Sequence, residues 1–205
     1  MPTSITLVRH GAVENPGKIL YGRLPGYPLS EVGLHQAKAA GQMLRDLDFS
    51  AVFVSPQLRT QQTVAVLAEG RAVTPVISSL IDEVRCFLEG ESLDAAAARE
   101  WDIYTGAPPG FEQPEDVIRR ARSFFALVLA QHPGENILAV THGDVIAFSA
   151  LWAFGLPITP MGKQKLRGSS MPDDYPDLAS ATTLQFDSGL AEELPSIVYR
   201  RAPLG

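Results

Sequence analysis

The chain has 205 residues, of which 45% are hydrophobic and 20% charged. These proportions are typical of a folded globular protein and exclude a disordered, collagen-like or coiled-coil chain. The net charge of −6 excludes a general positive field that would attract nucleic acid or an anionic membrane, although it allows a local positive pocket. At about 150 residues per domain, the length predicts one domain over residues 1–205.

The N-terminal residues and the cysteine content indicate a cytoplasmic protein. The single cysteine, Cys86, cannot form a disulfide within the chain, which favours a reducing compartment. Residues 1–8 show no secretory signal, and the weakly apolar stretch 145–156 is too short to cross a bilayer. We therefore expect neither nucleic acid nor a membrane among the partners.

The first part of the chain alternates buried strands with helices. Ile5–Val8 is a short run rich in β-branched residues without helical period, which predicts a strand buried on both faces. Ser30 predicts the N-cap of a helix. The apolar stripe of this helix comprises Leu34, Ala37, Gly41 and Leu44. Ala51–Val54 then predicts a second buried strand.

The next segment opens on Ser55 and Pro56, a capping hydroxyl followed by the proline that suits the first helical position. A helix is therefore predicted from there to about Glu69, with a short strand at Val73–Ile77. Residues 84–115 differ in kind, because an alanine-rich helical piece over residues 92–104 is followed by two prolines and a glycine. We interpret them as an insert.

The alternation continues toward the C-terminus. Glu115–Gln131 has a helical period, Asn136–Thr141 predicts a fourth strand, and Asp144–Phe154 predicts another helix. The irregular segment 157–181 has a length typical of functional or mobile loops. A closing hairpin is expected over residues 182–200. This order of elements predicts an α/β fold, a three-layer sandwich with a mostly parallel central sheet and helices on both faces.

Charged and histidine side chains follow four of the predicted strands. In chain order they are Arg9 with His10, Arg59, Asp82 with Glu83, and His142. The carboxyl ends of parallel strands share one edge of the sheet, so these side chains are expected to face one crevice. Two arginines match a phosphoryl group with planar, permanently charged forks, and a neutral imidazole is a competent nucleophile. The sequence therefore predicts a phosphate site, where a carboxyl group would protonate the leaving oxygen.

Other chemistries fit the sequence less well. His35 and His132 lie in the polar parts of predicted helices, and we interpret them as surface residues. Cys86 lacks the phosphate-binding loop of a cysteine phosphatase. The four histidines show no metal-ligand spacing, so no metal is expected.

Five motifs resemble those of the histidine phosphatase superfamily, which has the phosphoglycerate-mutase-like fold. They are Leu7–Gly11, with Arg-His-Gly after a strand; Tyr21–Ala37, leading into a helix; Ser55–Thr63, a helix start; Glu112 with Asp116 and Arg120; and Thr141–Gly143, a second histidine block. The resemblance extends over about residues 4–156, and the last fifty residues match weakly.

The resemblance implies a role for each residue at the strand ends. His10 would be the nucleophile that becomes phosphohistidine, and Glu83 would be the proton donor and then the base. The transferring phosphoryl group would be bound by Arg9, Arg59 and the catalytic His142. The family needs no metal, and no cofactor is expected.

The sequence departs from the family pattern at two places. After Arg-His-Gly the family often has an acid and then Ser or Thr, whereas Ala12 and Val13 stand here. The proton donor has two candidates: Glu83 fits if one residue has been lost before the following glycine, and Asp82 fits without that loss. Glu83 is favoured, because Val84 keeps the apolar residue that usually follows the donor.

Substrate specificity is expected in two segments. In family terms, the insert 84–115 lies over the pocket, and the segment 157–181 is a second candidate. Tyr21 and Arg23 are candidates for binding the rest of the substrate, because the matching family segment borders the pocket. We expect a small-molecule phosphate ester as substrate, and a homodimer stays open as a family-level alternative to a monomer.

Three functions remain open from the sequence. The first is a metal-independent phosphatase that acts through phosphohistidine on His10, with Glu83 as general acid and base. The second is a phosphoglycerate mutase or related phosphoryl transferase, against which Val84 argues, since mutases have arginine there. The third is a non-catalytic phospho-ligand-binding protein, against which the intact His10 argues, since binding alone needs no nucleophile.

Overall fold

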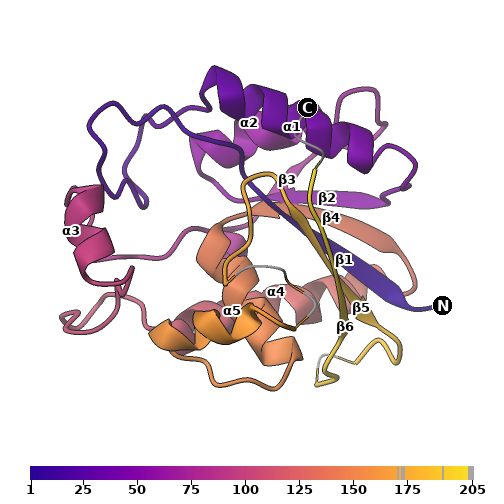
Figure 1. The fold of residues 1–205 in the computed structure, drawn as a ribbon. Helices are drawn as coiled ribbons and strands as arrows, with labels where there is room; N and C mark the ends of the chain where they lie inside the picture. Colours follow the sequence, from indigo (N-terminus) through magenta and orange to yellow (C-terminus); the bar gives the residue numbers. More distant parts are fainter. Residues whose placement is uncertain (170, 172–173, 191, 203–205) are drawn as a thin grey trace.

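The computed structural model describes residues 1–169, 171, 174–190 and 192–202, which form a central sheet between helices (Figure 1). Within these residues the sheet has six strands in the order β3-β2-β4-β1-β5-β6. In chain order they are β1 (Thr3–Arg9), β2 (Ala51–Val54), β3 (Val76–Ile77), β4 (Asn136–Thr141), β5 (Ala181–Phe186) and β6 (Ser196–Arg200). Strands β1 to β4 are parallel, whereas β5 and β6 form an antiparallel hairpin at one edge, as expected.

Helices cover both faces of this sheet. Helices α1 (Glu31–Met43) and α2 (Leu58–Leu67) lie on one face, and α4 (Pro114–Gln131) and α5 (Gly143–Ala153) lie on the other (Figure 1). An apolar core lies under each pair of helices. The arrangement confirms the predicted α/β sandwich with a mostly parallel sheet. A single domain over the whole chain stays a prediction.

The first strand carries the site to the edge of the sheet. Its apolar run is buried on both faces: Ile5 and Leu7 belong to the core under α4 and α5, and Val8 belongs to the core under α1 and α2. The register pairs Arg9 of β1 with Thr141 of β4, so these two strands end side by side. The turns that follow them therefore face the same crevice, where open α/β sheets bind ligands.

Helix α1 packs through smaller residues than the sequence pattern predicts. Ser30 caps the helix as expected, because its hydroxyl accepts the N–H of Gly33 at 3.1 Å. Leu34 was predicted on the buried stripe but is 38% exposed, whereas Gly33, Ala37 and Ala40 are buried. The turn after β1 lies so close that a Cβ on Gly33 would stand 2.0 Å from a backbone oxygen, which leaves room only for small residues.

Other elements are shorter than predicted. Helix α2 begins at Leu58 with Gln57 as its N-cap, because the Ser55 hydroxyl is engaged elsewhere in the fold. The helical piece predicted over residues 92–104 is confined to α3 (Leu93–Ala98). The segment 157–181 contains a 3-10 helix, η2 (Pro160–Leu166). None of the helices in the described residues has the length and apolar character that a membrane span requires.

Candidate active site

Residues His10 and His142 meet where β1 and β4 end. The N–H of His10 donates to the carbonyl oxygen of Thr141 at 3.1 Å, which continues the pairing of the two strands by one step. The ring centroids of His10 and His142 lie 5.3 Å apart, and the ring planes are inclined at 61°. Both side chains are buried. The structure thus brings together the two histidines that the sequence places after separate strands.

The ring of His10 is held in one orientation. Its Nδ1 lies 2.8 Å from the carbonyl oxygen of Gly11, so Nδ1–H donates and Nε2 carries the free lone pair when the ring is neutral. Burial, and next the neighbouring His142, Arg59 and Arg9, lower the pKa of His10 well below its usual value. The ring is therefore neutral at physiological pH, which is the state that a nucleophile needs.

Glycine follows His10 because no other residue fits there. A Cβ on Gly11 would stand 2.4 Å from the carbonyl oxygen of Gly33, which lies in the first turn of α1. The N–H of Gly11 also donates to the Thr63 hydroxyl of α2 at 3.2 Å. Both helices on this face thus fix the turn that presents His10.

Arg59 is the charged centre of the site. Its side chain is 1% exposed, and its Nη2 lies 2.8 Å from the carbonyl oxygen of Gly22, 3.2 Å from Glu83 Oε2 and 3.2 Å from His142 Nδ1. The ring of Tyr21 stacks on the guanidinium at 4.8 Å. A position in the first turn of α2 aims this side chain along the sheet edge rather than into solvent.

Arg9 is the last residue of β1 and reaches the same edge of the sheet. Its Nη1 donates to the carbonyl oxygen of Pro176 at 2.6 Å, and its guanidinium lies 4.9 Å from the centroid of the Tyr175 ring. Among the described residues, the buried Nε atoms of Arg9 and Arg59 have no hydrogen-bond partner. A buried donor without a partner is costly, so the site offers two N–H groups to an anion.

Glu83 and Asp82 lie on different sides of the His142 ring, at 3.2 Å from Nδ1 and 4.0 Å from Nε2 respectively. Oε2 of Glu83 lies 3.2 Å from His142 Nδ1, while Oδ1 of Asp82 accepts from Ser55 Oγ at 3.1 Å and from Gln57 Nε2 at 2.8 Å. Burial alone would raise the pKa of Glu83, but His142, Arg59 and the N–H of Val84 together hold it well below its usual value. Of the two candidates for proton donor, Glu83 is thus the one turned toward the reacting centre.

His142 is oriented by a chain of polar contacts. Ser55, predicted as a helix cap, instead lies 2.7 Å from His142 Nε2 and donates to Asp82. The Nε2–H of His142 therefore donates to Ser55 Oγ, and Nδ1 faces Glu83 and Arg59. When the ring is protonated, Nδ1–H donates to the Glu83 carboxylate. Burial is the main cause that lowers the pKa of His142, and Glu83 opposes it.

The two predicted substrate contacts have different positions. Tyr21 lines the large cavity beside the site. Arg23 does not line that cavity, because Nε donates to the carbonyl oxygen of Glu83 at 2.7 Å and Nη2 pairs with Glu112 at 3.0 Å. Arg120 pairs with the same Glu112 at 2.7 Å, so these motif residues support the turn that carries Glu83.

Comparison with known proteins identifies the family of the chain. The family model described as histidine phosphatase superfamily (branch 1) matches residues 5–171. The chain belongs to the histidine phosphatase superfamily. With phosphatases among its relatives, it is an enzyme of the phosphatase class.

Relatives of this histidine phosphatase match most of its length. The uncharacterized protein Rv0525 of Mycobacterium tuberculosis is 31% identical over 204 residues, which is 96% of this chain and 95% of the relative. Mouse fructose-2,6-bisphosphatase TIGAR is 34% identical over 184 residues, or 82% of this chain and 66% of its own length. Among solved structures, mycobacterial glucosyl-3-phosphoglycerate phosphatase Rv2419c matches with a TM-score of 0.74 and 25% identity, covering 98% of this chain and 97% of that one.

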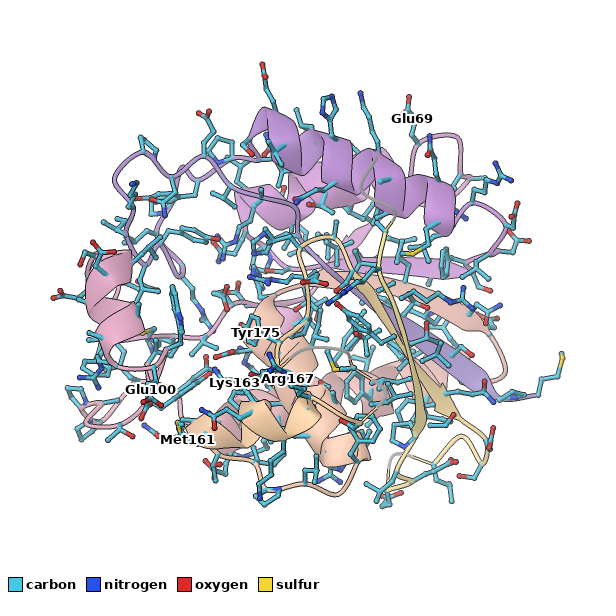
Figure 2. All side chains as sticks on the ribbon, viewed as in Figure 1. Glu69, Glu100, Met161, Lys163, Arg167 and Tyr175 are labelled. Carbon is cyan, nitrogen blue, oxygen red and sulfur yellow. The ribbon has the colours of Figure 1, made fainter. Side chains whose placement is uncertain are left out.

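The histidine phosphatase also holds a polar cluster that sequence reasoning missed. Asp144, in the first turn of α5, is buried and accepts from Tyr175 at 2.8 Å, from Lys163 at 3.0 Å and from Tyr104. Lys163 and Tyr175, both labelled in Figure 2, follow α5 in the chain, and Nζ of Lys163 lies 5.4 Å from the centroid of the Tyr175 ring. Most of these residues come from irregular segments. The available signal was the acid one position after His142-Gly143, which is equally typical of a helix start.

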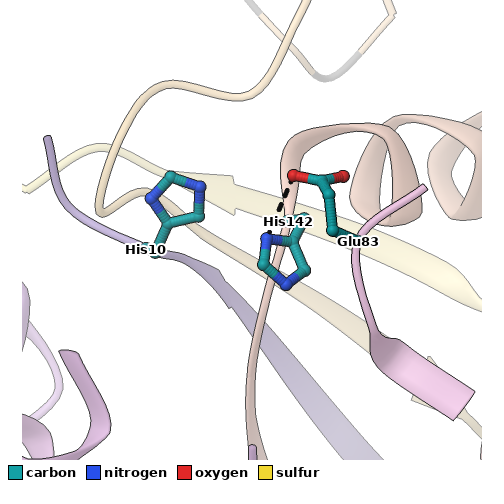
Figure 3. Close-up of side chains that lie close together, drawn as sticks. All are labelled: His10, Glu83 and His142. Carbon is teal, nitrogen blue, oxygen red and sulfur yellow. Dashed lines mark ion pairs between the residues drawn. The ribbon is translucent and has the colours of Figure 1, made fainter. Parts of the chain in front are cut away.

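Three side chains of the site have the spacing of metal ligands. His10, Glu83 and His142 each offer one ligand atom, and these atoms lie within 4.8 Å of one another (Figure 3). The guanidinium of Arg59 lies 3.2 Å from both Glu83 and His142, so a cation held there would meet a permanent positive charge. This donor set suits an anion better than a metal ion.

Proposed function

We propose that the protein hydrolyses a small-molecule phosphate monoester through a phosphohistidine on His10, with Glu83 as general acid and base. Arg9, Arg59 and His142 bind the transferring phosphoryl group. The observation that carries the proposal is the pair of buried, unpartnered Nε donors on Arg9 and Arg59. The positive charges of both arginines act on His10, a neutral imidazole with a fixed lone pair. Such donors stabilise charge that develops on phosphoryl oxygens.

The reaction has two steps. In the first, Nε2 of His10 forms a bond to phosphorus, the bond to the ester oxygen breaks, and Glu83 gives its proton to the leaving alcohol. In the second, Glu83 takes a proton from water as the water oxygen attacks phosphorus, and the bond to His10 breaks to release phosphate.

The protonation of Glu83 is linked to substrate binding. In the free site its pKa is low, because His142 and Arg59 stabilise the carboxylate. A phosphate dianion beside them would compete for the same positive charges and would repel the carboxylate, which raises its pKa. Glu83 therefore takes up the proton that the leaving group needs as the substrate enters.

The relatives support a phosphate ester in general terms. One is named for fructose 2,6-bisphosphate and another for glucosyl-3-phosphoglycerate, so their leaving groups differ. They favour hydrolysis of a small phosphorylated molecule without singling out either compound. A cytoplasmic location and independence of metal ions stay predictions.

The test is hydrolysis of an aryl phosphate between pH 5 and 8, with and without EDTA, by wild type, His10→Ala and the matched His132→Ala, whose histidine lies far along α4 from the site. We expect turnover that survives EDTA, persists in His132→Ala and is lost in His10→Ala. An acid-labile phosphoenzyme should form in wild type and should be absent in His10→Ala. Activity near wild type in His10→Ala would overturn the mechanism, and comparable turnover in a mutase assay primed with bisphosphoglycerate would change the assigned reaction.

A further inference from the structure

A cavity of about 620 Å³ opens directly from the phosphate site. Arg9, Tyr21 and Glu83 form its inner end, and residues of the insert and of η2 form its outer walls. The volume falls in the range of sites that enclose a drug-sized ligand. A phosphoryl group bound by the two arginines would leave most of this space for the leaving group.

The outer walls are mainly apolar. Leu20, Leu93 and Ile103 line the cavity, together with Trp101 and Met161, which are 50% and 43% exposed. Trp101 belongs to the insert, whereas Met161 lies in η2, so two segments far apart in the sequence present large apolar side chains to the same space. When a ligand covers exposed apolar surface of this kind, the free energy of the complex is lowered.

The charges on the walls disfavour a second phosphate. Among the lining residues in the described part of the chain, Lys163 is the one cation apart from Arg9, and its Nζ pairs with Asp144 at 3.0 Å. The remaining charged side chains on the outer walls are acidic: Glu89, Glu100 and Asp174. Asp174 pairs with Arg167 at 3.1 Å, so Glu89 and Glu100 carry the negative charge of these walls. Glu100 is exposed and lies at the same end of the molecule as Met161 (Figure 2).

We propose that the substrate is the monophosphate of a bulky, largely apolar alcohol that carries no second anionic group. The inference rests on the proposed function, since it takes the phosphoryl group to lie at His10. The apolar walls bind the body of the alcohol, and the acidic side chains reject bisphosphates and other esters with a negative charge outside the phosphate site.

The experiment separates binding from turnover. Four primary alkyl phosphates with leaving groups of similar basicity are compared: ethyl, butyl and naphthylethyl phosphate, and butanediol bisphosphate. Hydrolysis is measured as kcat/KM, and the corresponding phosphonates, which cannot be hydrolysed, are titrated by calorimetry. We expect kcat/KM for naphthylethyl phosphate to exceed that for ethyl phosphate by at least about tenfold, and the affinities of the two phosphonates to differ likewise. The kcat/KM for butanediol bisphosphate and the affinity for the bisphosphonate are expected to fall below those of the butyl compounds by a similar factor.

Two pairs of variants localise the effect. Met161→Ala should reduce the naphthylethyl advantage by several fold while ethyl is unchanged, and Leu127→Ala, at a comparably exposed position on α4, should not. Glu100→Lys should raise the affinity for butanediol bisphosphonate, whereas Glu69→Lys, beyond the end of α2 and outside this cavity, should not.

The outcomes distinguish the two proposals. Equal binding of all four phosphonates, or preference for the bisphosphonate, would overturn the substrate class even if phosphohistidine forms. Preference for naphthylethyl phosphonate with no hydrolysis and no phosphohistidine would overturn the mechanism and leave the cavity's selectivity standing.

Discussion

Oε2 of Glu83 lies 3.2 Å from Nδ1 of His142 and 3.2 Å from Nη2 of Arg59, which makes this carboxylate the acid beside both side chains. The carboxylate of Asp82, one residue earlier, lies 4.0 Å from Nε2 on the other side of the ring and binds Ser55 and Gln57. The two acids thus have different contacts, although the sequence motif accommodates either as proton donor. Neutral substitutions that keep the size of each side chain test which of the two is the donor.

Glu83→Gln should lower kcat by a factor of about 10² to 10⁴, the range for loss of a general acid. The loss should be larger for alkyl phosphates than for aryl phosphates, because a poor leaving group needs the proton more. Asp82→Asn serves as the matched control and should lose less than about tenfold in kcat per folded molecule. If Asp82→Asn instead shows the larger loss with the same dependence on leaving group, Asp82 is the donor.

Arg59→Lys should lower kcat/KM by about 10² or more, although the positive charge remains. Lysine has a single ammonium group and cannot present a planar fork whose Nη2 keeps its contacts while Nε stays free for a phosphoryl oxygen. Arg71→Lys is the control, since Arg71 donates to the carbonyl oxygens of Leu44 and Leu47 away from the site. Steady-state kinetics on one aryl phosphate checks both, and equal effects in the two variants would argue against a phosphate-binding role for Arg59.

The sequence predicts the parts of the fold that depend on local pattern. Strands β2 and β4 match their predicted bounds, because buried parallel strands are short apolar runs that end where polar residues begin. Since those ends share one edge of the sheet, the positions of His10, Arg59 and His142 followed as well. The strands and their ends thus allowed both the fold class and the central residues of the site to be predicted from the sequence.

Features set by distant contacts could not be predicted. Ser55 has the local signature of a helix cap, but His142, distant in the sequence, takes its hydroxyl. Tyr175 lies in an irregular segment with no periodicity, so nothing in the sequence indicates that it stacks on Arg9. Leu34 is exposed because close packing of α1 selects small residues over the apolar period.

The stability of the protein should fall as the pH drops below about 6.5. Because burial, His142 and the arginines lower the pKa of His10, the folded protein binds the proton on this ring less tightly than the unfolded chain does. Below the unfolded pKa of about 6.5, protonation therefore favours unfolding, by at most about 1.4 kcal/mol per pH unit for one proton. Glu83, whose pKa is also low in the folded state, adds a further loss near pH 4.

The pH dependence is checked by urea unfolding between pH 5 and 7.5. His10→Gln should flatten the slope of the unfolding free energy, and the exposed His35→Gln on α1 should not change it. His142, whose pKa is lowered as well, accounts for the slope that remains. An unchanged slope in His10→Gln would show that His10 titrates alike in the folded and unfolded states.

Asp144→Asn should destabilise the protein by about 3 kcal/mol, because it removes one partner of a buried ion pair. The side chains of Asp144 and Lys163 are only 5% and 12% exposed, so Lys163 would keep a charge with little access to water. Lys163→Met in the same chain removes that charge and should restore part of the loss, which a double-mutant cycle by urea unfolding measures. Additive losses in the double variant would mean that the two side chains do not stabilise each other. Because Tyr175 joins Asp144 to Arg9, the single variant should also raise KM more than it lowers kcat.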